Sequence, residues 1–131
     1  MNVAFYRKMF LVSAVWNLVG AVVLVLFMRP IFALSNVPVP DPPVWYYCWV
    51  ALFLTFGIGV LAAARDMYRN VLFFLLGIVG KVSFSIIYVY YFLVHRDQVP
   101  AFILIGVVGD LIFAGFYATF LRFAAGTTAR G

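Results

Sequence analysis

The chain has 131 residues, of which 67% are hydrophobic and 10% are charged, with a net charge of +5 and no glutamate. A composition this apolar excludes an ordinary soluble domain and is typical of an integral membrane protein. Basic residues beside lipid headgroups explain the net charge. No basic face is long enough to follow a phosphate backbone, so we expect membrane lipids as partners and no nucleic acid.

Four apolar stretches are long enough to cross a hydrocarbon core of about 30 Å, which requires about 20 residues in a helix. They are Met9–Met28, Val44–Ala64, Val71–Val94 and Val99–Leu121. Backbone groups in lipid must satisfy their own hydrogen bonds, so each stretch is predicted to be a helix. The sequence therefore predicts an all-α integral membrane protein. We expect residues 1–131 to form a single domain, an antiparallel bundle of four transmembrane helices.

Basic residues predict the orientation of this bundle, because positive residues near helix ends stay in the cytoplasm. One side of the predicted bundle carries Arg7, Lys8, Arg65, Arg69, Arg122 and Arg130. The opposite side carries only Arg29 and Arg96. We therefore expect a multi-pass protein of the cell (inner) membrane with both termini in the cytoplasm.

Two charged residues, Lys81 and Asp110, lie near the middle of adjacent apolar stretches. At a rise of 1.5 Å per residue, each is about 15 Å from the start of its predicted helix, and therefore near the bilayer centre. A charge at that depth costs about 2.5–3.5 kcal/mol on insertion scales. The two residues are the obvious partners for each other, and the sequence predicts an intramembrane ion pair.

Asn17 and Thr55, on the first and second predicted helices, lie at a similar depth, so every helix is expected to contribute one polar side chain to a central layer. Ser85 shares the face of Lys81. Small residues on the same faces allow membrane helices to approach closely. The glycines expected at the helix contacts are Gly20, Gly59, Gly77, Gly80, Gly106 and Gly109.

The last two apolar stretches also resemble each other. Residues Gly77–Tyr88 align without gaps on Gly106–Tyr117, with two glycines, a valine, a phenylalanine and a tyrosine in common. Lys81 then aligns with Asp110. Because the two helices are expected to run in opposite directions, the match suggests a small inverted repeat, a feature of many transporters. Chance similarity between apolar segments explains it equally well.

Other residue types exclude several chemistries. A lone cysteine, Cys48, cannot form an internal disulfide, and a lone histidine, His95, is a poor metal site. There is no catalytic constellation or phosphate loop, so we expect no metal, no cofactor and no enzyme. The aromatic residues that follow the proline-rich connection, Trp45 and Trp49 among them, indicate either an interfacial belt or an aromatic vestibule for a ligand.

The segment Trp16-Asn17-Leu-Val-Gly20-Ala21, the glycine-rich stretches around Lys81 and Asp110, and the length of the chain together resemble small bacterial four-helix inner-membrane proteins of the DoxX-like kind. This resemblance implies a four-helix layout and no particular catalytic residue. The chain is also similar in size to small multidrug transporters. Those proteins rely on a glutamate in the first helix, where this chain has Asn17.

Two functions therefore stay open. The first is a non-catalytic accessory, scaffold or self-assembling module, in which Lys81 and Asp110 join two helices. Its partner would be a second copy of the chain or a larger membrane protein. The second is a small transporter or a bundle that binds lipid or a small molecule, with the pair as a proton- or ion-responsive site. A tightly packed, dry pair favours the first function, and a cavity that reaches the pair favours the second.

Overall fold

A computed structural model describes residues 2–128 of the chain, so Arg130, which contributed to the predicted orientation, lies outside the described residues. The elements in chain order are α1 (Val3–Leu26), α2 (Met28–Leu34), α3 (Val44–Ala63), α4 (Val71–Val94), the short 3-10 helix η1 (Ala101–Ile103) and α5 (Leu104–Thr128). The described part of the chain is helical and contains no strand, which confirms the all-α prediction.

Four of the helices are long and apolar enough to cross a membrane, as predicted. α1 starts at Val3 rather than Met9, and α5 continues to Thr128 rather than ending at Leu121. The apolar pattern marks only the part of a helix that suits hydrocarbon, whereas the helix itself continues into the polar region. At the start of α1 the side chain of Asn2 accepts a hydrogen bond from the Phe5 amide at 3.0 Å, which caps the helix.

The short helix α2 was not predicted. The backbone of Phe27 (φ −113°, ψ 21°) leaves the helical conformation between α1 and α2. Pro30 is the third residue of α2, where the missing amide hydrogen costs little because first-turn amides have no partner within the helix. The first helix therefore ends at Leu26, two residues earlier than predicted, and the separate short helix α2 follows it.

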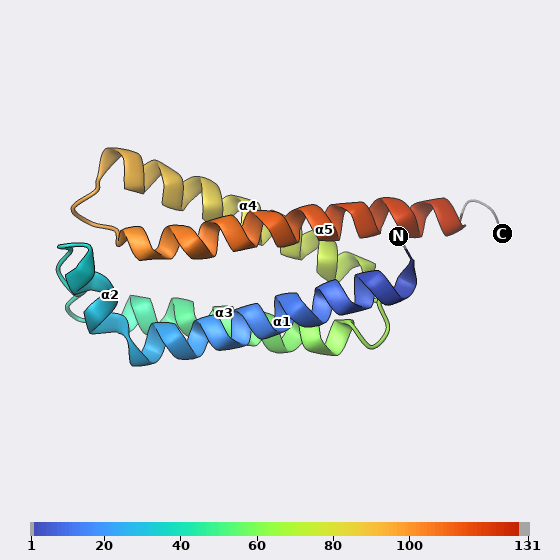
Figure 1. Cartoon of the computed structure of the whole chain (residues 1–131), viewed down its shortest axis with the longest axis horizontal. Helices are drawn as coiled ribbons and strands as arrows, with labels where there is room; N and C mark the ends of the chain where they lie inside the picture. Colours follow the sequence, from blue (N-terminus) through green and yellow to red (C-terminus); the bar gives the residue numbers. More distant parts are fainter. Residues whose placement is uncertain (1, 129–131) are drawn as a thin grey trace.

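The long helices form two pairs. α1 packs along α3, and α4 packs along α5, whereas contacts between the two pairs are much sparser (Figure 1). The start of α1 and the end of α5 lie at the same end of the molecule (Figure 1). We call this the Arg65 end, because the Arg7 guanidinium there is 3.5 Å from the Arg65 carbonyl, to which it donates. The opposite end, with α2 and η1, is the α2 end.

An aromatic core joins the two helix pairs toward the Arg65 end. Phe10 of α1 stacks on Phe74 of α4, with ring centroids 4.1 Å apart. Tyr117 and Phe120 of α5 meet Phe10 edge to face at 5.3 and 5.1 Å. All four rings are fully buried. Such edge-to-face and offset contacts are favourable beyond the area they bury, so this half of the molecule is closely packed.

The α2 end is held together differently. A second buried cluster includes Met28, Ile31 and Phe32 of α2 together with Tyr46 of α3 and Ile103 of η1. Between the two pairs, the Ala101 amide donates to the Ser35 hydroxyl at 3.1 Å. The segment that connects α4 to α5 is therefore fixed to the end of α2.

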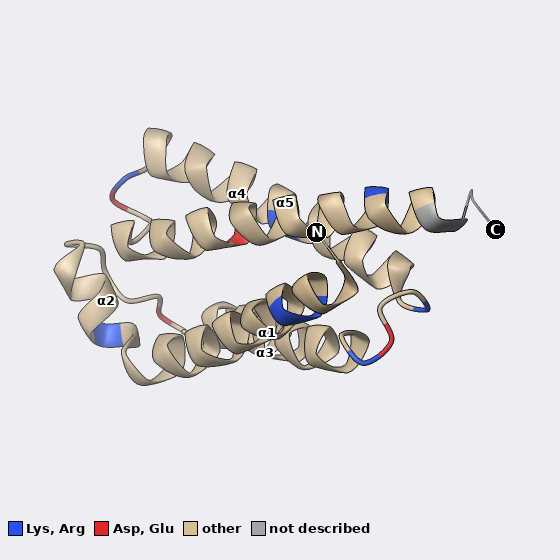
Figure 2. Cartoon of the chain, turned by 45° about the vertical axis from the view of Figure 1, so that its right-hand side comes forward, with Lys and Arg blue, Asp and Glu red and all other residues tan. Residues whose placement is uncertain are grey.

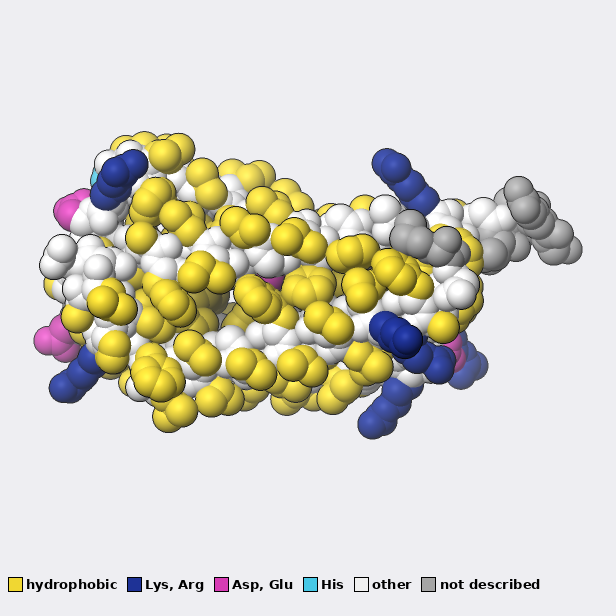
Figure 3. All heavy atoms as spheres, in the orientation of Figure 1, with side chains coloured by type: hydrophobic (Ala, Val, Ile, Leu, Met, Phe, Trp, Pro, Cys, Tyr) yellow, Lys and Arg dark blue, Asp and Glu magenta, His cyan; other side chains and the backbone are white. Residues whose placement is uncertain are grey.

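The surface fits a membrane environment. Apolar side chains cover the length of the molecule, and the exposed charged side chains gather at its two ends (Figure 3). This distribution is expected when the middle of a helical protein faces lipid and its ends face water.

Candidate functional site at the centre of the bundle

Lys81 of α4 and Asp110 of α5 form a direct ion pair, as predicted from the sequence. Their side chains are only 4% and 8% exposed. Lys81 is the eleventh of the 24 residues of α4, and Asp110 is the seventh of the 25 residues of α5, whereas most other basic and acidic segments lie near the ends of the molecule (Figure 2). Within the described residues, the only other ion pair joins Arg69 and Asp66 in the exposed α3–α4 connection. The central pair is therefore isolated from other charges.

Two further groups surround the Lys81 ammonium. The side-chain oxygen of Asn17 lies 3.5 Å from Nζ, which places the amide of α1 against the pair. The ring centroid of Phe56 on α3 lies 5.3 Å from the same nitrogen, within the range of a cation–π interaction. The three other long helices thus each place one group around the ammonium that α4 carries: Asn17 of α1, Phe56 of α3 and Asp110 of α5.

Ser85 and Asn17 each have a buried polar atom without a partner. The Ser85 hydroxyl lies one turn beyond Lys81 on α4, and neither it nor the Asn17 amide nitrogen has a hydrogen-bond partner among the described residues. An unpartnered buried polar atom costs about 1–3 kcal/mol. The central layer therefore retains hydrogen-bonding capacity that the protein itself does not use.

Thr55 does not belong to this layer, which corrects the sequence-based prediction. Its side chain is exposed, and its hydroxyl donates to the Ala51 carbonyl of its own helix at 2.8 Å. A threonine that bonds to the carbonyl four residues earlier needs no partner on another helix. The inward group of α3 at this depth is Phe56, an apolar residue that polarity alone does not single out.

Four of the six predicted glycines lie close to another helix. A Cβ at Gly20 would come within 3.0 Å of Phe53, one at Gly59 within 2.6 Å of Phe73, and one at Gly77 within 2.9 Å of Phe56. A Cβ at Gly109 would overlap the indole of Trp16. Gly57, which was not singled out from the sequence, is equally close, since its Cβ would lie 2.9 Å from that of Asn17. Gly57 lets α3 approach α1 where Asn17 turns toward Lys81.

Gly80 and Gly106 do not serve helix packing, contrary to the prediction. A Cβ at either position would meet no atom within 4 Å. Instead, both residues line a cavity between the two helix pairs. The absence of side chains at these positions enlarges the cavity next to Lys81 and Asp110.

The proposed repeat in α4 and α5 finds no support in these surroundings. The alignment matches Gly77 with Gly106 and Gly80 with Gly109. In each match one glycine is packed closely, while the other faces open space. Matched positions therefore have different neighbours, and the similarity of the two segments does not extend to the roles of their glycines.

The cavity has a volume of about 730 Å³, and both Lys81 and Asp110 are part of its wall. The remaining wall is apolar except for the tryptophan N–H groups, with residues from α1, α3, α4, η1 and α5. Val15 and Val19 of α1 and Leu52 of α3 belong to the wall and are also exposed on the outer surface. The cavity thus opens sideways, and a hollow between the helix pairs is visible in Figure 3.

Aromatic rings form one side of this cavity. Trp49 of α3 stacks on Phe84 of α4 with ring centroids 5.7 Å apart, and on Phe53 at 6.3 Å. All three residues line the cavity. Trp45, by contrast, is 81% exposed. The two alternatives for this aromatic segment therefore divide by residue: Trp45 has the exposure expected in an interfacial belt, and Trp49 belongs to an internal aromatic wall.

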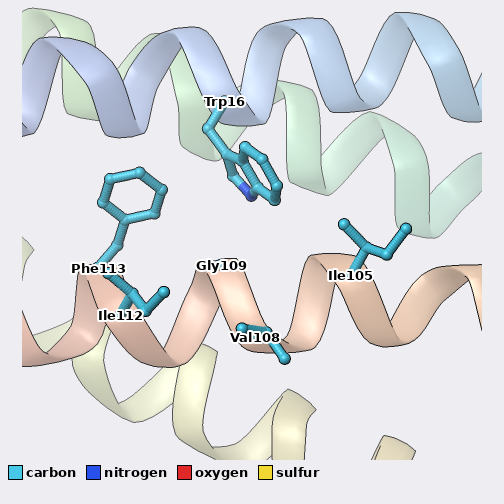
Figure 4. Close-up of a pocket in the computed structure, with 6 residues that line it drawn as sticks. All are labelled: Trp16, Ile105, Val108, Gly109, Ile112 and Phe113. Atoms are coloured by element: carbon cyan, nitrogen blue, oxygen red, sulfur yellow. The ribbon is translucent and has the colours of Figure 1, made fainter.

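A smaller pocket of about 400 Å³ lies between α1 and α5. Its wall is apolar, and Trp16 extends from α1 across Gly109, so that its indole N–H points toward α5 (Figure 4). Trp16 also lines the central cavity. This side chain therefore separates the central cavity from the α1–α5 surface.

Metal-binding residues do not cluster in the structure. Among residues 2–128 there is no group of three histidine, cysteine, aspartate or glutamate side chains placed to hold a metal ion. The geometry of the central layer offers one ion pair, two unpartnered polar atoms and a laterally open apolar chamber.

The chain was compared with protein families, curated proteins and solved structures, and none of them matches. The DoxX-like resemblance stays a prediction from the sequence. The class of the protein therefore rests on its own residues. It is an all-helical protein with four helices able to span a membrane and a buried lysine–aspartate pair.

Proposed function

We propose that the protein is a membrane-embedded binding module that takes up an apolar or amphipathic molecule from the lipid into its central cavity. The observation that carries this proposal is the cavity of about 730 Å³ that reaches both Lys81 and Asp110. Small-molecule sites are concave, mostly apolar chambers of about 300–1,000 Å³ with a few polar groups. The cavity fits that description in size and in composition.

Its lateral openings support entry from the membrane. Val15, Val19 and Leu52 line the cavity at mid-length and are exposed on the surfaces that would face lipid. A solute already dissolved in hydrocarbon can therefore reach the pair without crossing the polar ends. Both ends are closed by packed residues, the aromatic core at the Arg65 end and Ile103 at the α2 end.

The scaffold interpretation explains less of this arrangement. A purely structural ion pair is best surrounded by close packing and full hydrogen bonding. Here Gly80 and Gly106 leave open space beside the pair, and the Ser85 hydroxyl has no partner among the described residues. The binding interpretation accounts for the open space, because Gly80 and Gly106 both line the cavity. A scaffold or a self-associating bundle stays the second candidate, since the exposed helix faces are apolar enough to bind another membrane protein.

Filling the cavity should abolish binding without unfolding the protein. Gly80→Leu and Gly106→Leu place side chains into open space in the cavity wall, so we expect normal folding and loss of binding. Gly115→Leu is the matched control, because its Cβ also meets nothing within 4 Å and it lies outside the cavity. The measurement is quenching of tryptophan fluorescence by 1-bromododecane in nanodiscs, with Trp45→Phe leaving Trp16 and Trp49 as reporters.

We expect a saturable component of quenching in wild type and in Gly115→Leu, and no such component in the two cavity variants. Collisional quenching by probe dissolved in lipid rises without saturation and serves as the baseline. Equal saturable quenching in all four proteins would refute the binding proposal and favour the scaffold.

We further propose that the four long helices form an antiparallel transmembrane bundle in a bacterial inner membrane, with both termini in the cytoplasm. The Arg65 end carries Arg7, Lys8, Arg65, Arg69 and Arg122 with one acidic residue, Asp66, and such an excess of basic residues is typical of the cytoplasmic side. The α2 end carries Arg29 and Arg96 together with Asp41 and Asp97. The proline-rich connection before α3 then lies outside.

Cysteine labelling of intact cells tests this orientation. In a Cys48→Ala background, we expect an impermeant maleimide to label Val39→Cys from outside and to leave Tyr68→Cys unlabelled until the membrane is opened. Both positions are exposed in the structure, at 37% and 42%. The opposite labelling pattern would reverse the proposed topology.

A further inference from the structure

The polar groups of the central cavity define the kind of molecule that fits it. We propose that the ligand is an uncharged amphiphile with one hydroxyl-like group, which both donates and accepts a hydrogen bond at Lys81 and Asp110. This inference rests on the proposed function, because it names the ligand class of the same cavity. It is carried by the charge balance, the free hydrogen-bonding positions and the depth of the pair.

Charge balance excludes an ionic ligand. Lys81 and Asp110 neutralise each other, and the rest of the cavity wall carries no charged residue. A carboxylate or ammonium on the ligand would be a third charge without a partner inside hydrocarbon. An uncompensated charge in such surroundings is strongly unfavourable, because its loss of hydration is not repaid. An uncharged polar group leaves the pair balanced.

The free positions on the pair match a hydroxyl. An ammonium has three N–H donors, and those of Lys81 are directed to Asp110 and, at 3.5 Å, to Asn17, which leaves one donor. On Asp110 only Oδ1 is engaged by Lys81, and Oδ2 has no hydrogen-bond partner among the described residues. One donor and one acceptor therefore remain on neighbouring residues in the cavity wall. A hydroxyl group complements both, whereas an ether or a ketone complements only the donor.

Depth distinguishes this ligand from a bilayer phospholipid. Lys81 lies ten residues into α4, which starts at Val71, and ten residues of helix correspond to about 15 Å. A phospholipid that keeps its headgroup at the interface would bring only the end of an acyl chain to this depth. Methylene groups cannot use the free donor and acceptor. A solute that partitions into the hydrocarbon with its polar group can use both.

The cavity extends from the pair toward the α2 end, where Phe102 and Ile103 close it, past the stacked rings of Trp49 and Phe84. This part of the wall is apolar and suits the hydrocarbon body of the ligand. We therefore expect the hydroxyl beside Lys81 and Asp110 and the apolar body among the aromatic side chains.

A series of twelve-carbon probes with a terminal bromine tests the ligand class by the same tryptophan quenching. The probes are 1-bromododecane, 12-bromododecan-1-ol, ionised 12-bromododecanoate and 12-bromododecyl-trimethylammonium. We expect the alcohol to bind roughly tenfold more tightly than 1-bromododecane, the ratio that corresponds to about 1.4 kcal/mol. The two ionic probes should bind more weakly than 1-bromododecane.

The double variant Lys81→Met/Asp110→Leu shows whether the pair recognises the hydroxyl. In this variant the alcohol should bind no more tightly than 1-bromododecane, because the donor and the acceptor for the hydroxyl are both removed. Tighter binding of either ionic probe, or an unchanged alcohol preference in the double variant, would overturn the inference on ligand class while the binding proposal stands. Absence of saturable quenching by every probe would instead refute the proposed function itself.

Discussion

Replacing either member of the central ion pair alone should destabilise the protein by about 3–5 kcal/mol, the cost of leaving one buried charge without its partner. Lys81→Met strands the Asp110 carboxylate, and Asp110→Leu strands the ammonium. Replacing both together should recover most of the loss, because no charge then remains in the apolar interior. Reversible unfolding in mixed micelles, monitored by circular dichroism, measures the three values.

Leu76→Met serves as the control for an apolar replacement on α4, since Leu76 is 60% exposed on the surface of the molecule. Its stability should remain within about 0.5 kcal/mol of wild type, as for most surface substitutions. If the double variant lost as much stability as the two single losses combined, the two charges would be energetically independent, contrary to the ion pair in the structure.

Phe10→Ala should cost about 3–5 kcal/mol, the range found for removal of a large buried aromatic side chain. The Phe10 ring stacks on Phe74 and meets Tyr117 and Phe120 edge to face. Its removal leaves a void where α1, α4 and α5 meet, at the centre of the aromatic core that links the two helix pairs. The same unfolding measurement gives the effect.

The matched control is Phe27→Ala, at a ring that is 51% exposed between α1 and α2. It removes the same atoms from a site with few neighbours, and we expect a loss below about 1 kcal/mol. Equal losses at both positions would show that the aromatic core does not hold the helix pairs together.

The sequence was sufficient to predict the four long helices and the central pair, for a clear physical reason. Hydrocarbon forbids unpaired backbone groups and penalises isolated charges, so long apolar runs must be helical and Lys81 and Asp110 require compensation. Both rules act on residue type and spacing alone. Asn17 was placed near the pair by the same depth argument, and its oxygen does lie 3.5 Å from the lysine nitrogen.

The inward face of α3 could not be predicted in this way. The pattern of polar and small residues favoured the face of Thr55, whereas the buried residues of α3 are Tyr46, Val50, Gly57, Val60 and Ala63. The Thr55 hydroxyl donates to a carbonyl of its own helix, so it needs no buried partner on another helix. In an apolar helix, large aliphatic side chains fit lipid and protein equally well, so composition does not distinguish the two faces.

The cavity also could not be predicted from the sequence. Gly80 and Gly109 cannot be distinguished by residue type. The indole of Trp16 packs against Gly109, whereas a Cβ at Gly80 would meet no atom within 4 Å. Whether a glycine permits close packing or leaves a void depends on the side chain opposite to it, which follows from the crossing of two helix pairs. Three-dimensional contacts were needed to separate these roles.

Contacts join the two helix pairs on both sides of the central cavity. Phe10 stacks on Phe74 toward the Arg65 end, whereas the stacking of Trp49 on Phe84, Ile103 packing and the hydrogen bond from Ala101 to Ser35 connect the pairs toward the other end. In a bilayer, lateral pressure from the lipid would act on the open chamber between these contacts. Compression favours states with less internal void, so tighter lipid packing should narrow the chamber, and looser packing should widen it. The bilayer itself would then set how much room the chamber offers.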